Sequence, residues 1–317
     1  MSWQIHKLVY QAKSPIHIGY HKLGFIQRTR YYITGKAMWG AMTANITRAF
    51  YGESGAKAED YEKVGKKLCG EIIPSYFYPA IKQGEAQYDP LLPRFGKQGL
   101  KYGKYSAEEF ERRFIHSFGQ TAIEAANLTA EDNTLHETEY IASVIEKDGE
   151  QKPVYFVGYI FAKTPTVKFD EVNGAEEKSW DDIKEIISEI FVGGERRYGF
   201  GRLRLDPSLM IYPAEDFFGY KVDTNIASFN IPYGEPIHGH LPVKENLILK
   251  GDIEPLVGRE WGTGKDGEVV FGQKVSNAKI CWMPGSIIEE GKSLKIGDYG
   301  IFEQEDKNRK GLLTPLI

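Results

Sequence analysis

The chain has 317 residues, of which 41% are hydrophobic and 13% aromatic, so it is long and apolar enough for one large or two medium folded domains and is not a disordered chain. Its two cysteines, Cys69 and Cys281, are far apart in the sequence, which argues against a disulfide framework and against a cysteine zinc site. The sequence shows neither a signal peptide nor an apolar run of about 18 residues, so we expect a cytoplasmic protein without a membrane span.

The formal net charge of −4 hides an uneven distribution of charged residues. No Asp or Glu occurs from Met1 to Gly52, whereas this stretch contains seven basic residues. These are Lys7, Lys13, Lys22, Arg28, Arg30, Lys36 and Arg48. Four further arginines stand between Gly193 and Arg204 against the single Glu195. The pattern predicts a positive face on an otherwise acidic body.

The first predicted element is a strand within Trp3–Gly19, where apolar, β-branched and aromatic residues alternate loosely with polar ones. A polar, basic loop is expected next. A helix of about 17 residues follows, with Thr34 as its N-cap and with its end near Phe50, before Gly52. The small residues in this helix, Ala37, Gly40, Ala41 and Ala44, form a stripe that predicts close packing against a sheet.

The middle of the chain is predicted to contain strands and loops separated by Pro and Gly. Ser106 is the expected cap of a short helix. Residues 120–145 alternate at both ends around a polar centre, which predicts a hairpin-like excursion. The apolar run 153–163 predicts a strand, and Ser179 with Asp182 predicts the start of a helix whose apolar residues continue to Phe191.

The predicted order is strand, helix, strands, helix, glycine-rich loop and strand, which is the βαββαβ order of a ferredoxin-like or RRM-like domain with insertions. Beyond Pro213 the sequence predicts only short strands separated by Gly and Pro. We therefore expect an α+β protein with a ferredoxin-like domain at residues 1–214, which includes the glycine-rich loop, and a β-rich C-terminal domain at residues 215–317.

The glycine-rich loop lies in the stretch "FVGGERRYGFGRLRL", residues 191–205. Glycine permits a positive φ and close backbone approach, an arginine fork matches phosphate oxygens, and tyrosine can stack on a base. The predicted RNA-binding residues of this loop are Gly193, Gly194, Arg196, Arg197, Tyr198, Gly199, Gly201 and Arg202. A dinucleotide fingerprint or a P-loop does not fit, because the glycines precede a strand and no GxxxxGK[ST] occurs. A glycine turn with solvated arginines is the alternative.

A second basic segment, "RTRYYITGK", precedes the first predicted helix. Arg28 and Arg30 stand ahead of Thr34, Gly35 and Lys36, where the free amides of a helix N-terminus favour a phosphate. In a ferredoxin-like domain this segment and the glycine-rich loop can meet on one side of the sheet.

Three segments resemble, in order, the landmarks of the RAMP superfamily of CRISPR-associated proteins. They are "SPIHIGYHKLGFIQRTRYYITGKAMWGAM", "QTAIEAANLTAEDNTLHETEYIAS" and "GGERRYGFGRLRL". Near the end, "CWMPGSIIEE" resembles a strand of the subunits that cap the 5′ end of the guide in type III effector complexes.

The resemblance implies an RRM-like fold and two kinds of partner, the CRISPR guide RNA and the other subunits of a type III RNA-guided complex. The RNA contacts that the resemblance implies fall on the residues named above, and we expect no cofactor, no metal and no catalytic residue. Two departures matter. The family's usual "PGS" is "TGK" here, so a charged lysine replaces the serine hydroxyl. The glycine-rich loop lies in the middle of the chain, which argues against the guide-processing branch of the family.

A backbone subunit or an endoribonuclease cutting target or precursor guide RNA is the alternative function. His17 and His21 are the candidate acid–base groups, and Glu124, Asp132 and Glu137 are the candidate acids. The loop before the first helix contains no acid, which weakens a target-cutting role. A module that docks an acidic protein partner is a third possibility.

Two other features in the second half of the chain are weaker indications of a functional site. His238 and His240 would lie on one strand face, where a metal could use the pair, but no third ligand is evident. The aromatic residues of "GREWG", residues 258–262, and Trp282 are expected to be core or interface residues.

Overall fold

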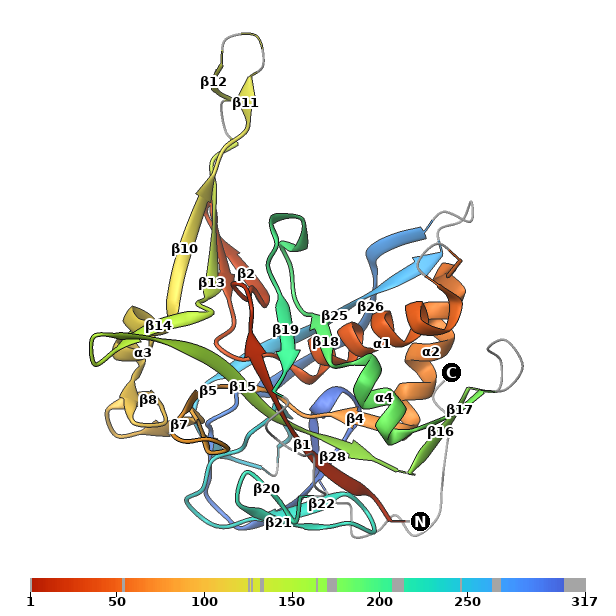
Figure 1. Ribbon diagram of the computed structural model, residues 1–317. Helices are drawn as coiled ribbons and strands as arrows, with labels where there is room; N and C mark the ends of the chain where they lie inside the picture. The colour runs from red at the N-terminus through yellow and green to blue at the C-terminus, as the bar shows by residue number, and fades with distance from the viewer. Residues whose placement is uncertain are drawn as a thin grey trace.

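An antiparallel sheet lies at the centre of the chain in a computed structural model (Figure 1). The structure describes residues 2–52, 55–124, 126, 128–131, 134–163, 165–169, 176–206, 214–245, 247–263 and 269–304. The strands of the central sheet are, in spatial order, β18 (Glu189–Phe191), β19 (Arg202–Leu205), β1 (Gln4–Ala12), β15 (Glu150–Ala162), β5 (Tyr78–Lys82) and β6 (Tyr88–Pro90). Two further strands, β4 (Ile72–Pro74) and β14 (Val144–Lys147), also pair with β15.

Both faces of the central sheet are buried. Along β15, Phe156 and Ile160 belong to one hydrophobic cluster, whereas Tyr159 and Phe161 belong to a second. Successive side chains of a strand point to opposite faces, so the two clusters cover the two faces. Burial on both sides explains why this strand is a continuous apolar run rather than an alternating one, and the predicted strand is confirmed.

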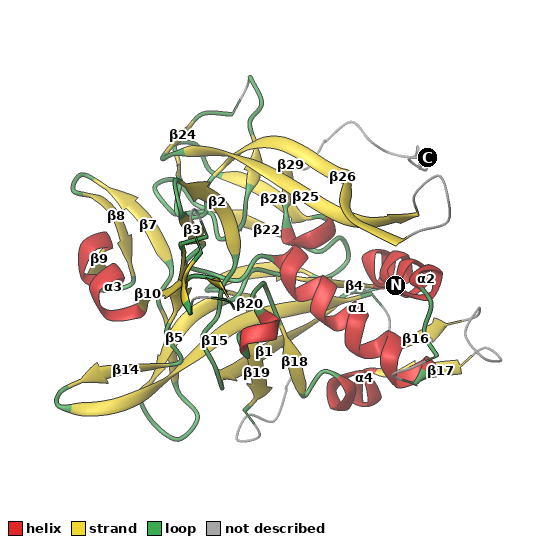
Figure 2. Cartoon of the chain, turned by 90° about the horizontal axis from the view of Figure 1, so that it is seen from above, coloured by secondary structure: helices red, strands yellow, loops and turns green. Residues whose placement is uncertain are grey.

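Three helices cover one face of the sheet, as Figures 1 and 2 show: α1 (Gly35–Tyr51), α2 (Ala58–Glu71) and α4 (Trp180–Ile186). A fourth, α3 (Ala107–Phe114), packs beside a small sheet of β7 (Pro93–Gly96), β8 (Gly99–Tyr102) and β9 (Tyr105–Ser106). The predicted N-caps of α1, α3 and α4 are confirmed, because the side chains of Thr34, Ser106 and Ser179 each accept a hydrogen bond from a backbone amide of the first turn.

One helix prediction needs correction, and one helix was missed. The helix that starts after Ser179 ends at Ile186 and does not reach Phe191, because Ile190 and Phe191 pair with Leu203 and Arg202 in a hairpin. Helix α2 was not predicted from the sequence. Its side chains are mostly charged, and it buries only Val64, Gly65 and Leu68, so its apolar stripe is narrow.

Glycine 40 of α1 does not lie at a close contact, contrary to the predicted small-residue stripe. Met38, Ala41, Met42 and Ile46 are the apolar residues that α1 buries, and a Cβ added to Gly40 would have no heavy atom within 4 Å. The substitution Gly40→Ala is therefore expected to raise the free energy of unfolding by up to about 1 kcal/mol, because alanine restricts the unfolded chain and favours the helix. Chemical denaturation checks this, and destabilisation would contradict the assignment of open space.

A second sheet projects from the body of the molecule (Figure 1). Its strands, in spatial order, are β10 (Ile115–Gln120), β13 (His136–Ile141), β3 (Ile26–Thr29) and β2 (Gly19–Leu23). At its far end lies the small hairpin of β11 (Ile123–Glu124) and β12 (Thr129–Ala130). The predicted hairpin-like excursion is confirmed, whereas the predicted basic loop forms β2 and β3. All five residues of β2 are exposed, which explains why its sequence lacks the alternating apolar pattern of a half-buried strand.

The C-terminal strands cover the other face of the central sheet. Their cluster includes Ile5 and Phe161 of the central sheet as well as Phe217, Phe229 and Phe302. One C-terminal sheet contains, in spatial order, β20 (Asp216–Phe217), β21 (Tyr220–Asp223), β22 (Ser228–Ile231), β28 (Lys292–Ile296) and β29 (Phe302–Gln304). The other strands are β23 (Leu241–Pro242), β26 (Val269–Trp282) and β25 (Ile253–Thr263) in one sheet, and β24 (Leu249–Lys250) with β27 (Ile287–Ile288) in another.

The remaining elements are the hairpin of β16 (Thr166–Phe169) and β17 (Glu176–Ser179) and the short 3-10 turns η1 (Arg196–Tyr198) and η2 (Asp298–Gly300). The fold is thus α+β and rich in strands, as expected. Within the described ranges, no helix is both long and apolar enough to cross a membrane.

Candidate nucleic-acid interface

The glycine-rich loop is the connection of the β18–β19 hairpin, at the edge of the central sheet (Figure 1). It therefore joins two antiparallel strands and does not directly follow a helix. Its backbone turns at four positions with positive φ, namely Gly193, Glu195, Gly199 and Gly201, and its tip is the 3-10 turn of Arg196–Tyr198. Glu195 is the one non-glycine residue among the four, and its carbonyl accepts a hydrogen bond from the amide of Tyr198 at 2.9 Å.

Residues Ser14–His17 hold the base of this loop. The amide of Gly194 donates to the carbonyl of His17 at 2.9 Å, and the amide of Gly201 donates to the carbonyl of Pro15 at 2.8 Å. A Cβ at Gly193 would lie 2.0 Å from the His17 carbonyl oxygen, so only glycine fits there. The close approach that these glycines permit is to the protein's own chain, and it fixes the tip in place.

Two of the four arginines in this segment are neutralised within the hairpin. Glu189 accepts hydrogen bonds from Nε of Arg202 at 2.8 Å and from Nη2 of Arg204 at 2.9 Å. These hydrogen bonds lower the pKa of Glu189, so its carboxylate is charged at neutral pH. Arg202, which was predicted to bind RNA, thus has an ion-pair partner in the protein.

Arg196 and Arg197 have no carboxylate partner among the described residues. Arg196 donates only to the backbone carbonyl of Gly193, at 3.2 Å, and both side chains are exposed. Tyr198 beside them is 58% exposed. Two guanidinium groups without a carboxylate partner in the described part of the chain therefore stand with an exposed aromatic ring at the tip of the loop.

Arg48, in the last turn of α1, adds to the positive potential at the tip. Partial desolvation and the nearby charge of Arg48 lower the pKa of Arg196, although Arg196 is exposed. Asn45 joins α1 to this region, because its side-chain amide donates to the carbonyl of Glu189 at 2.6 Å. The sequence shows that Arg48 is one of the basic residues of the first 52. It does not show that Arg48 lies near this loop, because the position of Arg48 depends on how α1 packs against β18.

His17 and His21, the candidate acid–base pair, occupy different environments. His17 is buried, and its Nδ1 donates to the carbonyl of Glu139 at 2.7 Å. His21 is exposed on β2. Both residues line a shallow hollow of about 200 Å³ with Lys22, Gln27 and Arg28. Since His17 supports the glycine-rich loop, its observed contacts are those of a structural residue.

The basic segment ahead of α1, which contains Arg28 and Arg30, is more buried than the sequence predicts. Arg28 forms an ion pair with Glu139 at 2.8 Å and is about one-third exposed. Arg30 is buried and is bonded to Glu254 of β25. Residues distant in sequence therefore neutralise Arg28 and Arg30, two of the three arginines of the acid-free stretch.

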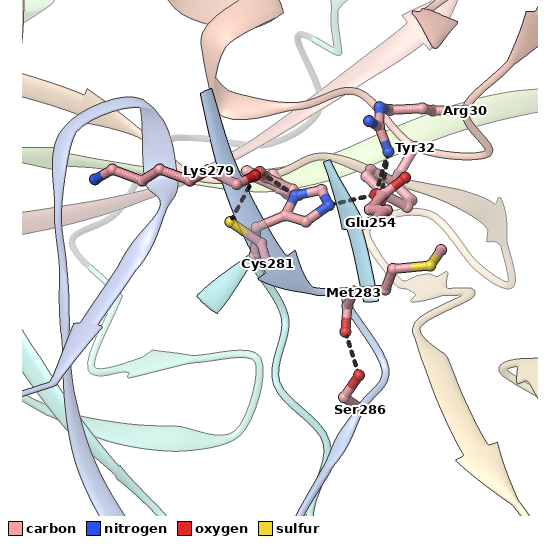
Figure 3. A network of polar contacts seen from close by, with 9 residues as sticks. Arg30, Tyr32, Glu254, Lys279, Cys281, Met283 and Ser286 are labelled. Carbon is pink, nitrogen blue, oxygen red and sulfur yellow. Dashed lines mark hydrogen bonds and ion pairs between the residues drawn. The ribbon is translucent and has the colours of Figure 1, made fainter. Parts of the chain in front are cut away.

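Arg30 belongs to a buried polar network, which Figure 3 shows. Glu254 accepts hydrogen bonds from Arg30 and from Nε2 of His240, and the Tyr76 hydroxyl lies 2.5 Å from Nδ1 of His240. A neutral imidazole protonated on Nε2 satisfies both contacts, with Nδ1 as the acceptor. Burial alone would raise the pKa of Glu254, but His240 and Arg30 lower it, so the carboxylate is charged.

The N-terminus of α1 packs against the C-terminal part of the chain. A Cβ at Gly35 would lie 2.2 Å from the carbonyl oxygen of Tyr299 and 2.6 Å from that of Pro74. Thr34 caps the helix, and the amine of Lys36 lies 4.8 Å from the ring centroid of Tyr299. The segment that contacts the glycine-rich loop is Ser14–His17 rather than this helix start.

The remaining candidate catalytic acids and metal ligands lie in different parts of the structure. Glu124 lies in β11 and is exposed, Glu137 lies in β13, and Asp132 lies outside the described residues. His238 and His240 lie in a buried bend and not on a strand face, and both His240 nitrogens are engaged. Among the residues that the structure describes, no group of three or more His, Cys, Asp and Glu could hold a metal ion.

The segment that resembles a guide-capping strand lies in the interior. Cys281 is buried at the end of β26, and the Ser286 hydroxyl donates to the Met283 carbonyl at 2.7 Å (Figure 3). Trp282 is partly buried against the second hydrophobic cluster, which agrees with a core aromatic residue.

Two buried histidines make the stability of the fold depend on pH. Burial, and then the charge of Arg94, lowers the pKa of His238 to about 3, and burial followed by Lys184 lowers that of His6 to about 4. Both are neutral in the folded chain at pH 7. Below about pH 6.5 the unfolded chain binds protons that the folded chain does not, so stability is complete above that pH and falls on acidification.

We therefore expect the substitution His238→Phe to flatten the fall in unfolding free energy between about pH 6 and pH 4, by roughly 1.4 kcal/mol per pH unit. Phenylalanine suits the site, because His238 packs among the rings of Tyr78, Phe218 and Tyr220. Denaturation of the two proteins at several pH values measures the difference, and equal slopes would show that His238 titrates normally in the folded state.

No family model matches the chain, and no curated protein matches it. It is similar to a chain of the cryo-EM structure of the Type III-B Cmr-beta bound to cognate target RNA and AMPPnP, with a TM-score of 0.47 and 13% identity over 90% of this chain and 86% of that one. A chain of the Type III-B Cmr-beta bound to cognate target RNA gives a TM-score of 0.45 and 13% identity over 89% and 86%. A chain of the apo state gives 0.38 and 11% over 65% and 99%.

Proposed function

We propose that this chain is a non-catalytic CRISPR RNA-binding subunit of a type III RNA-guided effector complex, which grips the 5′ handle of the guide and contacts neighbouring subunits. The observation that best supports RNA binding is the arrangement of side chains at the tip of the β18–β19 hairpin. There Arg196 and Arg197 have no carboxylate partner among the described residues, and Tyr198 is exposed beside them. Arginine forks suit phosphate oxygens, and an exposed ring suits an unpaired base.

The fixed backbone of the loop supports this role. Hydrogen bonds from Gly194 and Gly201 to Ser14–His17 hold the hairpin, so binding RNA there costs little ordering of the protein. The pairing of Arg202 and Arg204 with Glu189 leaves the positive potential at the tip. We therefore assign the phosphate contacts to Arg196 and Arg197, with Arg48 contributing through its charge.

We infer a ferredoxin-like arrangement for the first domain. The strands β19, β1, β15 and β5 are neighbours in that order, and α1 and α4 follow β1 and β15 in the chain. This is the order expected of a βαββαβ unit with its two helices on one face. The division into residues 1–214 and 215–317 belongs to the same proposal.

Ultraviolet cross-linking of the assembled complex tests the proposal. A tagged copy of the chain is purified with its partners, irradiated and digested, and peptides that carry nucleotides are identified by mass spectrometry. We expect guide RNA to copurify and cross-links to fall within residues 191–205. Absence of guide RNA, or release of the chain by high salt with no effect of nuclease, would favour docking to an acidic protein and overturn the proposal.

A further inference from the structure

The two faces of the projecting β10–β13–β3–β2 sheet differ in charge. Strand pairing places Phe118 opposite Thr138, Thr138 opposite Gln27, and Gln27 opposite Lys22, so these four side chains share one face. The alternation of side chains puts their sequence neighbours on the other face. That opposite face carries both acids of these strands, Glu137 and Glu139.

Side-chain contacts agree with this assignment. On the first face, Nε2 of His136 lies 2.9 Å from Oε1 of Gln120, and the ring centroids of His116 and Tyr140 are 6.1 Å apart. On the opposite face, Arg28 forms its ion pair with Glu139. The first face, which we call the hairpin face, therefore contains Lys22, Gln27, His116, Phe118, His136 and Tyr140 and no acid.

The hairpin face is aromatic and is open at Phe118 and at Lys22, whereas Thr138 between them is buried. Phe118 is 47% exposed, and Lys22 and His116 are exposed as well. Lys22 has no ion-pair partner among the described residues. An exposed aromatic ring that shares a sheet face with a lysine and with amide side chains, and with no carboxylate of these four strands, complements the flat surface of a nucleobase and the charge of its phosphate.

The hairpin face is continuous with the glycine-rich loop. Phe200, which follows Gly199 in the loop, contacts Tyr140 of β13 edge to face, with ring centroids 5.4 Å apart. His17, whose carbonyl accepts from Gly194, bonds to the backbone of Glu139 in the same strand. Figure 1 shows the β18–β19 hairpin beside the projecting strands. An RNA strand held at Arg196 and Arg197 can therefore continue onto this face.

We propose that the hairpin face binds unpaired RNA bases, with Phe118 as the ring on which a base stacks and Lys22 as a phosphate contact. This inference rests on the proposed function and adds a base-binding surface outside the glycine-rich loop. Stacking on an aromatic ring does not depend on base identity, so the face selects single-stranded over double-stranded RNA and not a particular sequence.

Binding of a fluorescein-labelled single-stranded oligoribonucleotide to the full chain, followed by anisotropy, tests the inference. We expect Phe118→Ala to weaken binding about tenfold and to leave the salt dependence unchanged, because it removes stacking and no phosphate contact. Phe118→Tyr should restore the affinity. Leu23→Ala is the matched control, since Leu23 is 60% exposed on the opposite face, and it should have no effect.

Oligonucleotides containing 5-iodouridine give an independent measurement. Photocross-links should map to the peptide that contains Phe118, and a blunt duplex of the same sequence should give none there. The inference is overturned if Phe118→Ala binds like the unchanged chain, if Leu23→Ala loses as much affinity, or if the duplex competes equally. If Arg196 and Arg197 prove necessary while Phe118 does not, only this inference fails. If the unchanged chain binds no RNA, the proposed function fails with it.

Discussion

The substitution Arg30→Ala is expected to lower the free energy of unfolding by about 3–5 kcal/mol. Arg30 is 9% exposed and its partner Glu254 is 5% exposed. Removal of the guanidinium would leave a buried carboxylate with His240 as a neutral donor, and an uncompensated buried charge is strongly destabilising. Denaturation by urea at neutral pH measures the loss.

A surface ion pair provides the control for this measurement. Arg94 bonds to Glu235 at 2.8 Å with both side chains more than 40% exposed, so Arg94→Ala should cost at most about 1 kcal/mol. If Arg30→Ala does not fold, Arg30→Lys serves instead, because it keeps the charge but loses the guanidinium fork and should give an intermediate loss. A cost for Arg30 no larger than that for Arg94 would contradict the description of a closed network.

This network explains why charge along the sequence overstates charge on the surface. The first 52 residues contain no acid, yet Arg28 and Arg30 are paired with Glu139 and Glu254 from distant parts of the chain. Ion pairs between residues more than 100 positions apart leave no local pattern in the sequence. The predicted positive face is therefore restricted to arginines and lysines without such partners, of which Arg196 and Arg197 are the clearest.

Helix starts and a buried strand were predicted correctly where neighbouring residues in the sequence determine the local structure. The caps of α1, α3 and α4 were found because a hydroxyl next to an apolar helical pattern satisfies free amides of the first turn. The strand at β15 was found because burial on both faces requires a continuous apolar run.

Structures that depend on pairing with distant segments were not predictable. The residues of β18 continue the helical spacing of α4, and only their pairing with β19 makes them a strand. Strands β2 and β3 exist because β3 pairs with β13, which lies more than 100 residues away. Tyr299 packs against Gly35 at the N-terminus of α1, and this contact between distant residues was equally unpredictable from the sequence.

The double substitution Arg196→Ala and Arg197→Ala is expected to weaken binding of single-stranded RNA about 100-fold. Each guanidinium is assigned to a phosphate, and loss of a charged hydrogen bond costs about 1.5 kcal/mol or roughly tenfold in affinity. The slope of log K against log salt should become shallower by about 1.4, because each phosphate contact to a single strand contributes about 0.7. Affinities for two oligonucleotides of different sequence should fall equally, since phosphate contacts carry no sequence information.

The change in net charge must be separated from the loss of the loop contacts. Lys97→Ala with Lys101→Ala removes the same charge from the exposed β7–β8 hairpin and should leave affinity within about twofold at physiological salt, where distant surface charges are screened. Thermal unfolding of both double variants should match that of the unchanged chain, because Arg196 and Arg197 are exposed. Equal losses of affinity in the two double variants would mean that RNA responds to net charge alone, and the assignment of the phosphate contacts to the tip of the glycine-rich loop would then be wrong.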